Sequence, residues 1–426
     1  MSKLPGDVFL VGGSVRDKLL GLDITERDWL VVGCSAAEIE RLGYVSVGKD
    51  FPVYLHPESK EEYALARTER KTGLGHLGFE TTANEKVTLE EDLARRDLTI
   101  NAIAEGLDGG LHDPYGGKED ISNKVLRHVT DAFCEDPLRI LRVARFAARF
   151  HHLGFTIAEE TMRLMTGMSQ ADELQTLPPE RIWRETEKAL ATQDPRIFFE
   201  TLRACDALKE VFPEIDALFG IPQRPEYHPE IDSGLHTMLA LDQICLQTED
   251  TRMRFATLVH DLGKATTPKD LLPSHHGHEM RSAELTKELC ARLRIPNDYK
   301  KLAVRVGRYH LHCHRALELK PSSLEELLTK LDAWRTTNYL DGFVNCCLAD
   351  ARGRTGLENR PYPQFEFLLD CAKAAKSIDV SALRERGLEG EKLGQAIRQA
   401  RIKELSSVKE RYSHIDEQRY ARTKTA

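Results

Sequence analysis

The sequence of 426 residues contains no run of about 18 consecutive apolar residues and no Cys-x-x-Cys pair. The first absence argues against a membrane-spanning helix. Because the amino-terminal segment turns polar by Asp7, we also expect no secretory signal peptide. Two of the nine cysteines, Cys346 and Cys347, are adjacent and poorly placed for a structural disulfide, so reduced thiols are the better interpretation. We expect a cytoplasmic protein without a membrane partner, a monomer or alternatively a homodimer.

The sequence also lacks an excess of positive charge, internal repeats and low-complexity segments. Its formal net charge is −8, so a nucleic-acid partner would have to bind to local basic surfaces. The length suggests two to four domains. Strand patterns concentrate before residue 115, whereas the chain after residue 130 is rich in Leu, Ala, Glu and Arg. This distribution predicts an α+β protein, with a mixed-sheet head followed by a mostly α-helical remainder.

One stretch near the start organises the head. Residues 8–11 predict a strand, Gly12-Gly13 a turn, and the next residues a short helix carrying Arg16. Paired glycines let a backbone approach a ligand closely, and phosphate suits such a turn. Glu26 and Asp28 alternate at the start of a second strand over residues 29–32, so both carboxylates face one side. Together they suit Mg²⁺ that carries a nucleoside triphosphate. For Gly-Gly alone, a surface turn would be the alternative.

The rest of the head contains further strands and two charged stretches. We expect strands over residues 45–47, 51–55 and 62–67. Arg67 to Lys71 places cations where a triphosphate could bind, and Thr72 to Glu85 is either a mobile loop at the site or a plain surface excursion. Thr88 is a plausible helix N-cap with Glu91 at the capping-box position. Arg95-Arg96-Asp97 ends that helix, and on pattern alone it could be a solvated cluster.

A helix opening at Pro137 carries arginines at positions 139, 142, 145 and 149. They form a stripe roughly 120° wide, and such a stripe is normally a solvated face. Asp136 and Arg139 lie one turn apart, however. An acceptor from Asp136 and donors from Arg139 could together distinguish cytosine and adenine from guanine and uracil.

A second group of chemically capable residues follows after position 230. His236, the pair His260-Asp261 and Asp350 lie far apart in the sequence. Two imidazoles and two carboxylates can hold one divalent ion, and Ni²⁺, Co²⁺ or Mn²⁺ would suit imidazole better than Mg²⁺. His275, His276, His278 and His310 could bind phosphate or a second metal, or be merely exposed. For His312 and His314 we predict structural roles.

These motifs resemble two known families. Gly12-Gly13-Ser14-Val15-Arg16-Asp17 with Glu26-x-Asp28 resembles the head of class II tRNA nucleotidyltransferases, whose first acidic residue is more often Asp. The run Arg95-Arg96-Asp97-x-Thr-x-Asn-Ala and the motif Glu135-Asp136-x-x-Arg139 match the same family. His236…His260-Asp261-Leu-Gly-Lys…Asp350 resembles the HD phosphohydrolase superfamily. The combination resembles the HD-domain-containing bacterial CCA-adding enzymes.

The resemblance implies a role for each matching residue. Glu26 and Asp28 would hold catalytic Mg²⁺, with Glu62 as a candidate third carboxylate. Gly13, Arg16 and Arg96 would bind triphosphate and sugar, Asp136 and Arg139 would select CTP and then ATP, and Arg142 and Arg145 would contact the nucleotide. The head would add CCA to the 3′ end of tRNA. The HD domain, with His236, His260, Asp261 and Asp350 as ligands of Ni²⁺ or another transition metal, would have 2′,3′-cyclic phosphodiesterase, 2′-nucleotidase and phosphatase activities.

On this basis we expect four segments: a nucleotidyltransferase head over residues 1–130, a helical neck and body over 131–227, an α-helical HD domain over 228–370 and a tail over 371–426. From Arg384 onward the tail has eleven Lys and Arg against seven Asp and Glu, and it either contacts tRNA or is solvated. Three alternative functions stay open: a bacterial poly(A) polymerase, an HD nucleotide phosphohydrolase with a nucleotide-sensing head, and a catalytically silent RNA-binding scaffold.

Overall fold

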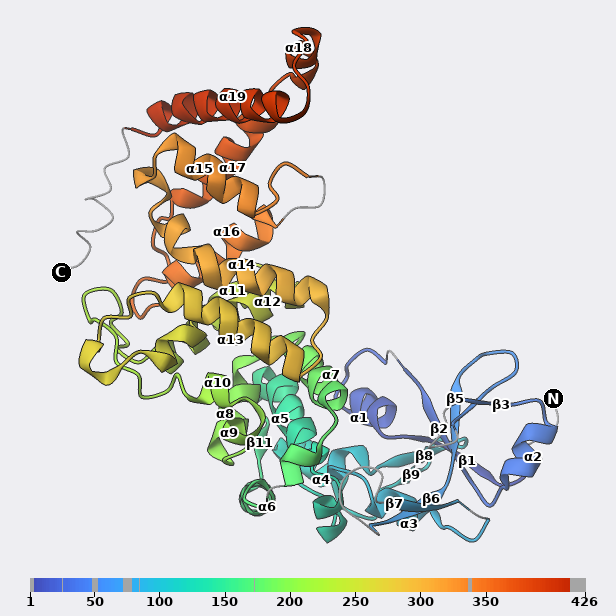
Figure 1. The fold of residues 1–426 in the computed structure, drawn as a ribbon. Helices are drawn as coiled ribbons and strands as arrows, with labels where there is room; N and C mark the ends of the chain where they lie inside the picture. Colours follow the sequence, from blue (N-terminus) through green and yellow to red (C-terminus); the bar gives the residue numbers. More distant parts are fainter. Residues whose placement is uncertain are drawn as a thin grey trace. The chain divides into compact units, whose positions relative to one another are not determined.

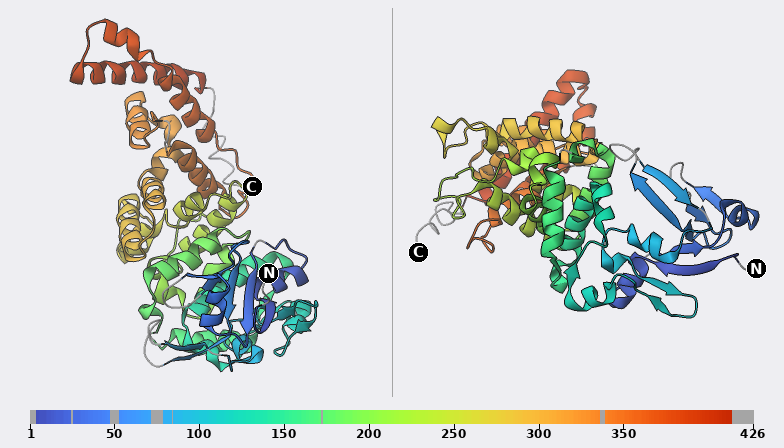
Figure 2. Two further views of the ribbon diagram at one scale, coloured as in Figure 1. Left: turned by 90° about the vertical axis from the view of Figure 1, so that its right-hand side faces the viewer. Right: turned by 90° about the horizontal axis from the view of Figure 1, so that it is seen from below.

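A computed structural model describes residues 4–24, 26–47, 53–71, 79–83, 85–171, 173–335 and 339–413. The chain divides into two compact units, Met1–Val211 and Phe212–Ala426 (Figures 1 and 2). The first unit contains the sheet, and the second is helical in its described residues. The prediction of a mixed-sheet head followed by a mostly helical remainder is therefore confirmed. In the described part of the chain, no helix is long and apolar enough to span a bilayer.

The head is built on a mixed seven-stranded sheet with the spatial order β3-β4-β5-β2-β1-β8-β9. Strand β2 pairs antiparallel with β1 and parallel with β5, and the other neighbours in this sheet are antiparallel. Two further strands, β6 and β7, form a separate antiparallel pair, and β10 and β11 form a short parallel one. The strands are β1 (Asp7–Val11), β2 (Asp28–Val32), β3 (Val45–Val47), β4 (Val53–Leu55), β5 (Glu62–Leu65), β6 (Arg67–Lys71), β7 (Phe79–Ala83), β8 (Ala104–Gly106), β9 (Leu111–His112), β10 (Val125–Leu126) and β11 (Thr156–Ile157).

Helices and short 3₁₀ turns make up the rest of the first unit. In chain order they are α1 (Gly13–Leu19), α2 (Ala36–Arg41), α3 (Leu89–Ala94), η1 (Thr99–Asn101), α4 (Gly117–Asn123), η2 (Asp131–Glu135), α5 (Leu138–Phe150), η3 (His151–Leu153), α6 (Glu159–Ser169), η4 (Glu173–Thr176), α7 (Pro179–Leu190), α8 (Arg196–Ala204) and α9 (Leu208–Val211). Helix α5 packs against both α7 and α8.

Successive residues of β2 point to opposite sides of the sheet, and each side packs against a core cluster of its own. Leu30 joins a core cluster that includes Leu93 of α3. Val31 joins a second cluster that includes Ile39 of α2. With each face buried, the register of β2 is fixed, and the polar residue that opens the strand, Asp28, is held at one edge of the core.

Most local predictions for the head agree with the structure, and two are wrong. The strand predicted over residues 62–67 ends at Leu65, because Arg67 begins β6, which pairs with β7 outside the main sheet. The capping box at Thr88 and Glu91 is present, and the strands over residues 8–11, 29–32 and 45–47 occur within β1, β2 and β3. The predicted loop from Thr72 to Glu85 is wrong over 79–83, because these residues form β7 and pair with β6. Backbone pairing with β6 overrides the local turn signals there. Residues 72–78 lie outside the described part.

The second unit contains helices throughout its described residues (Figure 1). Helices α11, α12, α14 and α16 pack against one another, and α13 covers α14 and η5. Farther along, α15, α17 and α19 pack together. The elements are α10 (Pro213–Asp216), α11 (Ser233–Cys245), α12 (Thr251–Leu258), η5 (Leu262–Thr266), η6 (Lys269–Leu271), α13 (His278–Arg292), α14 (Asn297–His314), η7 (Ala316–Glu318), α15 (Pro321–Lys330), α16 (Leu340–Arg352), α17 (Gln364–Lys376), α18 (Val380–Glu385) and α19 (Gly390–Arg411).

Candidate active sites

The turn between β1 and α1 brings the backbone close to the side chain of Arg96. Gly12 has φ 69° and ψ −125°, a conformation that glycine adopts without strain. A Cβ atom on Gly12 would lie 2.9 Å from Arg96 Nη1. The backbone conformation therefore favours glycine at this position, and a larger residue would also displace the end of the Arg96 side chain.

Neighbouring strands bring carboxylates together beside this turn. Asp28 opens β2 opposite Val11 of β1, and it stands in register with Glu62 on β5. Glu26 lies two residues earlier and is exposed. Desolvation raises the pKa of Asp28, the charge of Arg96 opposes that rise, and the charge of Glu26 adds to it. Carboxylates that disfavour one another's charge are suited to a divalent cation.

Asp92 in α3 positions two arginines next to this acidic edge. Its buried carboxylate lies 2.6 Å from Arg95 Nη2 and 3.1 Å from Arg96 Nη2. Burial alone would raise the pKa of Asp92, but the charges of Arg96 and Arg95 outweigh burial and lower it. The carboxylate is thus ionised at neutral pH and holds both guanidinium groups at the end of α3.

A buried chain of hydrogen bonds connects the head to α5. Arg142 Nε donates to Asp97 Oδ2 at 2.8 Å, and Asn101 Nδ2 donates to Asp97 Oδ1 at 2.9 Å. Arg16 Nη1 donates to Asn101 Oδ1 at 2.5 Å. Burial would raise the pKa of Asp97, but the charge of Arg142 and these hydrogen bonds hold it well below its ordinary value. Asp97 and Asn101 are not among the predicted site residues, although they fix Arg16 and Arg142 relative to each other.

Two more interactions hold this face of α5. Arg16 pairs with Asp17 at 2.8 Å, and the other oxygen of Asp17 lies 2.9 Å from Arg149 Nη2. Arg145 Nε donates to Glu185 of α7 at 2.6 Å. Three arginines of the α5 stripe, Arg142, Arg145 and Arg149, therefore pair with carboxylates of the same unit, so the stripe is not a plain solvated face.

Asp136 and Arg139 have different partners in the structure. Asp136 precedes α5, and its Oδ2 lies 2.9 Å from Arg181 Nη2 of α7. Arg139 donates to the carbonyl oxygens of Ala132 at 2.6 Å and Arg95 at 2.5 Å. Arg181 is a neighbour of Asp136 that the sequence pattern does not reveal, because only the packing of α7 on α5 brings it there.

One cavity of about 470 Å³ collects these side chains, a size suited to a small-molecule ligand. Eight predicted residues line it: Gly13, Arg16, Asp28, Arg96, Asp136, Arg139, Arg142 and Arg145. Of the two predicted metal-binding carboxylates of the head, Glu26 and Asp28, only Asp28 is among the described lining residues. Nine arginines and three aspartates line the cavity, and this balance favours a polyanion such as a nucleoside triphosphate. The arginines that were not predicted as site residues are Arg67, Arg95, Arg149 and Arg181.

In the second unit, four predicted ligands from three segments meet in the interior. His236 comes from α11 and Asp350 from α16, and all four side chains are almost fully buried. Helix α12 ends at Leu258, so the pair His260-Asp261 lies in a turn. There the two side chains converge, with His260 Nε2 3.1 Å from Asp261 Oδ2. On a regular helix they would diverge by about 100°.

The first cluster comprises His236, His260 and Asp350. His236 Nε2 lies 3.0 Å from Asp350 Oδ1, and His260 Nε2 lies 3.8 Å from Asp350 Oδ2. The Nδ1 atom of His260 lies 2.7 Å from the carbonyl oxygen of Thr257. Since a carbonyl only accepts, Nδ1 carries the proton in the neutral ring, whose Nε2 lone pair then faces the carboxylates. Burial lowers the pKa of His260, but the charges of Asp261 and Asp350 outweigh burial and raise it.

A second cluster shares Asp261 with the first. His278 Nε2 lies 3.2 Å from His310 Nε2 and 3.2 Å from Asp261 Oδ1. The Nδ1 atom of His278 faces the carbonyl oxygen of His275, and that of His310 faces the carbonyl oxygens of Val306 and Gly307. In the neutral rings, both Nε2 atoms therefore carry lone pairs that face each other. Burial lowers the pKa of His310 to about 3, so its ring is neutral at neutral pH.

Two buried atoms of this site, His260 Nε2 and Asp261 Oδ1, form no hydrogen bond. Lone pairs that converge in a buried place without shared protons are suited to cations. Among the described residues, three groups of donors are close enough to hold a divalent metal. His236, His260 and Asp350 form one, and Asp261, His278 and His310 form another. The third group, His228, Glu230 and His236, shares His236 with the first. The carboxylate of Asp261 can serve the first two groups through its two oxygens.

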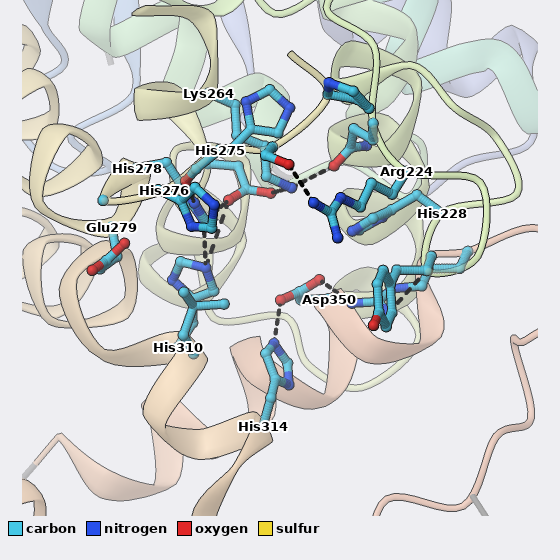
Figure 3. A pocket seen from close by; sticks show the side chains of 18 residues that line it. Arg224, His228, Lys264, His275, His276, His278, Glu279, His310, His314 and Asp350 are labelled. Atoms are coloured by element: carbon cyan, nitrogen blue, oxygen red, sulfur yellow. Dashed lines mark hydrogen bonds and ion pairs between the residues drawn. The ribbon is translucent and has the colours of Figure 1, made fainter. Parts of the chain in front are cut away.

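Basic side chains and further imidazoles line the open side of the two clusters, among them the labelled Arg224 and Lys264 (Figure 3). The cavity there has about 410 Å³ and is lined by Arg224, Lys264, His275, His276 and Arg354 in addition to metal-capable residues. Lys264 Nζ lies 2.5 Å from Asp261 Oδ2. His314 Nε2 lies 2.6 Å from Asp350 Oδ2, and its predicted structural role stays a prediction. The arrangement can hold a phosphoester beside two cation positions.

Comparison with known proteins gives a consistent result for both units. Residues 8–127 match the family model of the poly A polymerase head domain, 154–219 that of the probable RNA and SrmB-binding site of polymerase A, and 234–333 that of the HD domain. A multifunctional CCA protein of Shewanella denitrificans is 55% identical over 403 residues, which cover 95% of this chain and 98% of the relative.

Solved structures of CCA-adding enzymes share the fold. A complex with ATP has a TM-score of 0.64 at 21% identity, over 94% of this chain and 86% of that one. The Thermotoga maritima enzyme in complex with tRNA has a TM-score of 0.62 at 20% identity, over 98% of this chain and 90% of that one.

Proposed function

Because the chain belongs to the family of multifunctional CCA proteins, we propose that it adds C, C and A to the 3′ end of tRNA from CTP and ATP and that its HD domain hydrolyses phosphoesters. The observation that carries the first activity is the cavity that nine arginines line together with Asp28. The terminal 3′-hydroxyl of tRNA attacks the α-phosphorus of the nucleotide, the bond to the β-phosphate breaks, and pyrophosphate leaves.

The side chains of the head divide the work of binding and orientation. Arg16, Arg96 and Gly13 bind triphosphate and sugar, while Arg142 and Arg145 contact the nucleotide from α5. Asp97, which accepts hydrogen bonds from Arg142 and Asn101, is a positioning residue. Glu26 and Asp28 would hold Mg²⁺, with Glu62 in register beside Asp28 as the third carboxylate. When bound, Mg²⁺ lowers the pKa of the attacking hydroxyl and neutralises charge on the leaving group.

Asp136 and Arg139 select the base. The carboxylate of Asp136 can accept from the amino group shared by cytosine and adenine, and Arg139 can donate to a ring nitrogen. Arg181, 2.9 Å from Asp136, orients the carboxylate. Both selecting residues have protein partners in the structure, so we expect the nucleotide to replace some of these bonds when it binds.

For the HD domain we propose hydrolysis of 2′,3′-cyclic phosphates, 2′-nucleotides and other phosphomonoesters at the two clusters. His236, His260, Asp261 and Asp350 would hold Ni²⁺ or another divalent transition metal, and His278 and His310 a second ion that shares Asp261. Such ions supply Lewis acidity toward the phosphoester and the attacking water. Lys264 and Arg354 lie at the cavity and can neutralise the phosphate charge.

Incubation of tRNA lacking CCA with labelled CTP and ATP, followed by sequencing of the products, tests the first activity. We expect CCA to be added, and no addition by Asp28→Asn. Addition of adenosine alone would favour a poly(A) polymerase, and hydrolysis without addition would favour a phosphohydrolase with a sensing head. We further propose a cytoplasmic monomer with the segment limits 1–130, 131–227, 228–370 and 371–426.

A further inference from the structure

A second cavity in the unit Phe212–Ala426 adjoins the cavity at the two histidine-carboxylate clusters. It has about 510 Å³, within the size range of small-ligand pockets. Five residues line both cavities: Tyr227, His228, Leu311, His314 and Arg354. A ligand whose phosphate lies at the two clusters can therefore extend past these residues into the second cavity.

The walls of the second cavity carry positive charge and an accessible aromatic ring. Arg354 and Arg360 both line it, with Glu226 as the carboxylate among the described lining residues. Burial lowers the pKa of Arg360, and the nearby charge of Arg354 lowers it further, so the two positive charges lie close to each other. Arg354 Nη2 also lies 3.4 Å from Asp350 Oδ1. Two like charges in one wall are stabilised by an anion between them. Tyr227 is 49% exposed at the boundary between the cavities.

Two polar atoms in this wall are buried without a hydrogen-bond partner. Arg354 donates through Nη1 to the carbonyl oxygen of Tyr227 at 3.2 Å, yet its Nε atom has no acceptor. Gln364 donates through Nε2 to the carbonyl oxygen of His314 at 3.0 Å, yet its Oε1 atom has no donor. Unsatisfied buried groups of this kind are costly and often mark a place for a ligand or water.

We propose that the second cavity binds the 3′-terminal nucleotide of an RNA whose terminal phosphate lies at the HD clusters. In this arrangement the base stacks on Tyr227, and the 5′-phosphodiester of the same nucleotide lies between Arg354 and Arg360. A free nucleoside 2′,3′-cyclic phosphate fills only part of this site, because it has no 5′-phosphate. The HD domain thereby prefers the end of an RNA chain to mononucleotides. The proposal rests on the proposed hydrolase function and names its substrate class.

The test compares three substrates: a dinucleotide ending in a 2′,3′-cyclic phosphate, adenosine 2′,3′-cyclic phosphate and p-nitrophenyl phosphate. For the wild type we expect the dinucleotide to have the lowest KM. Arg360→Ala should lower the ratio of kcat/KM for the dinucleotide over that for p-nitrophenyl phosphate about tenfold, through loss of a charged hydrogen bond. Tyr227→Ala should lower the same ratio by a similar factor of about ten, through loss of base stacking. Arg315→Ala, which removes a 70% exposed arginine paired with Glu318, is the matched control and should change no ratio.

An unchanged ratio in both variants would overturn the proposal. Binding of a dinucleotide 3′-phosphate, measured by titration calorimetry, separates this failure from failure of the hydrolase itself. Tight binding by the wild type that Arg360→Ala weakens about tenfold would support the subsite even if no phosphoester were cleaved. Binding equal in the wild type and both variants would contradict the subsite whether or not the domain hydrolyses its substrates.

Discussion

At the scale of single residues, buried carboxylates determine the orientation of arginines in the head cavity of about 470 Å³. Asp92 holds Arg95 and Arg96, and Asp97 holds Arg142. A surface ion pair contributes little to stability, but loss of one partner of a buried pair costs several kcal/mol. These aspartates therefore serve both the fold and the site.

Asp97→Asn should destabilise the protein by about 3 kcal/mol, because it leaves Arg142 without its anionic partner. The pKa of Asp97 is lowered in the folded state. Its ionised form thus contributes stability above the ordinary pKa of about 4, and this contribution is lost as the pH falls below that value. Urea unfolding followed between pH 7 and pH 3 checks the expectation. The variant should lose less stability than the wild type over this range, and parallel curves would contradict it.

Arg139→Ala and Arg181→Ala should both relax base selection. Loss of a bidentate contact costs about 1–3 kcal/mol of discrimination, so we expect UTP and GTP to be incorporated at least about tenfold more often. Arg163→Ala on α6, a 73% exposed residue paired with Glu159, is the control. Misincorporation is measured by sequencing tRNA products formed with each nucleotide alone. Wild-type fidelity in both variants would show that Asp136 and its neighbours do not read the base.

The residues that the sequence could not reveal are those whose partners come from distant segments. Asp28, Arg142 and His236 belong to motifs with recognisable spacing, so the sequence alone identifies them as candidate site residues. Asp97 lies in the matching run that begins at Arg95, but the run does not reveal its contact with Arg142. Arg181 belongs to no motif, and it reaches Asp136 only because α7 packs on α5. A charged residue in an ordinary helix carries no local signal of such a contact.

At the scale of elements, the ends of helices and strands decide the geometry of both sites. Asp28 is the first residue of β2, and its carboxylate is placed by pairing with β1 and β5. Helix α12 stops at Leu258, and the turn that follows lets His260 and Asp261 converge. The apolar pattern of α12 indicates a helix but does not fix its last residue, because helix ends depend on tertiary packing.

Helices α13 and α14 supply the two histidines of the second cluster, His278 and His310. Replacement of one of them in His310→Ala should therefore remove one of the two metal ions that we propose. We expect the metal content, measured by mass spectrometry after dialysis against Ni²⁺, to fall from about two to about one ion per chain, with at least about a tenfold loss of hydrolysis. His312→Ala, an exposed histidine on the same helix, is the matched control. Equal metal content in His310→Ala and wild type would show that His310 is not a metal ligand.

At the scale of the whole molecule, the chain carries two chemistries on two compact units. The arginine-lined cavity proposed to bind nucleotide is built from residues before Val211, and both clusters proposed to bind metal from residues after Phe212. Carboxylates at the head favour Mg²⁺, whereas imidazoles in the HD domain favour softer transition metals. The mixed-sheet head and helical remainder follow from composition and periodicity, but the division at residue 211 does not, because no linker of distinct composition marks it.

The central claim is that these two sites work independently, and a pair of variants tests it most directly. CCA addition to tRNA and hydrolysis of a 2′,3′-cyclic nucleotide are measured for wild type, Asp28→Asn and His260→Ala, with Mg²⁺ and Ni²⁺ both present. We expect Asp28→Asn to lose nucleotide addition and keep hydrolysis within about twofold, since no ligand of the HD clusters is removed. His260→Ala should show the reverse. Loss of both activities in either variant, or of neither, would contradict the assignment of two separate active sites.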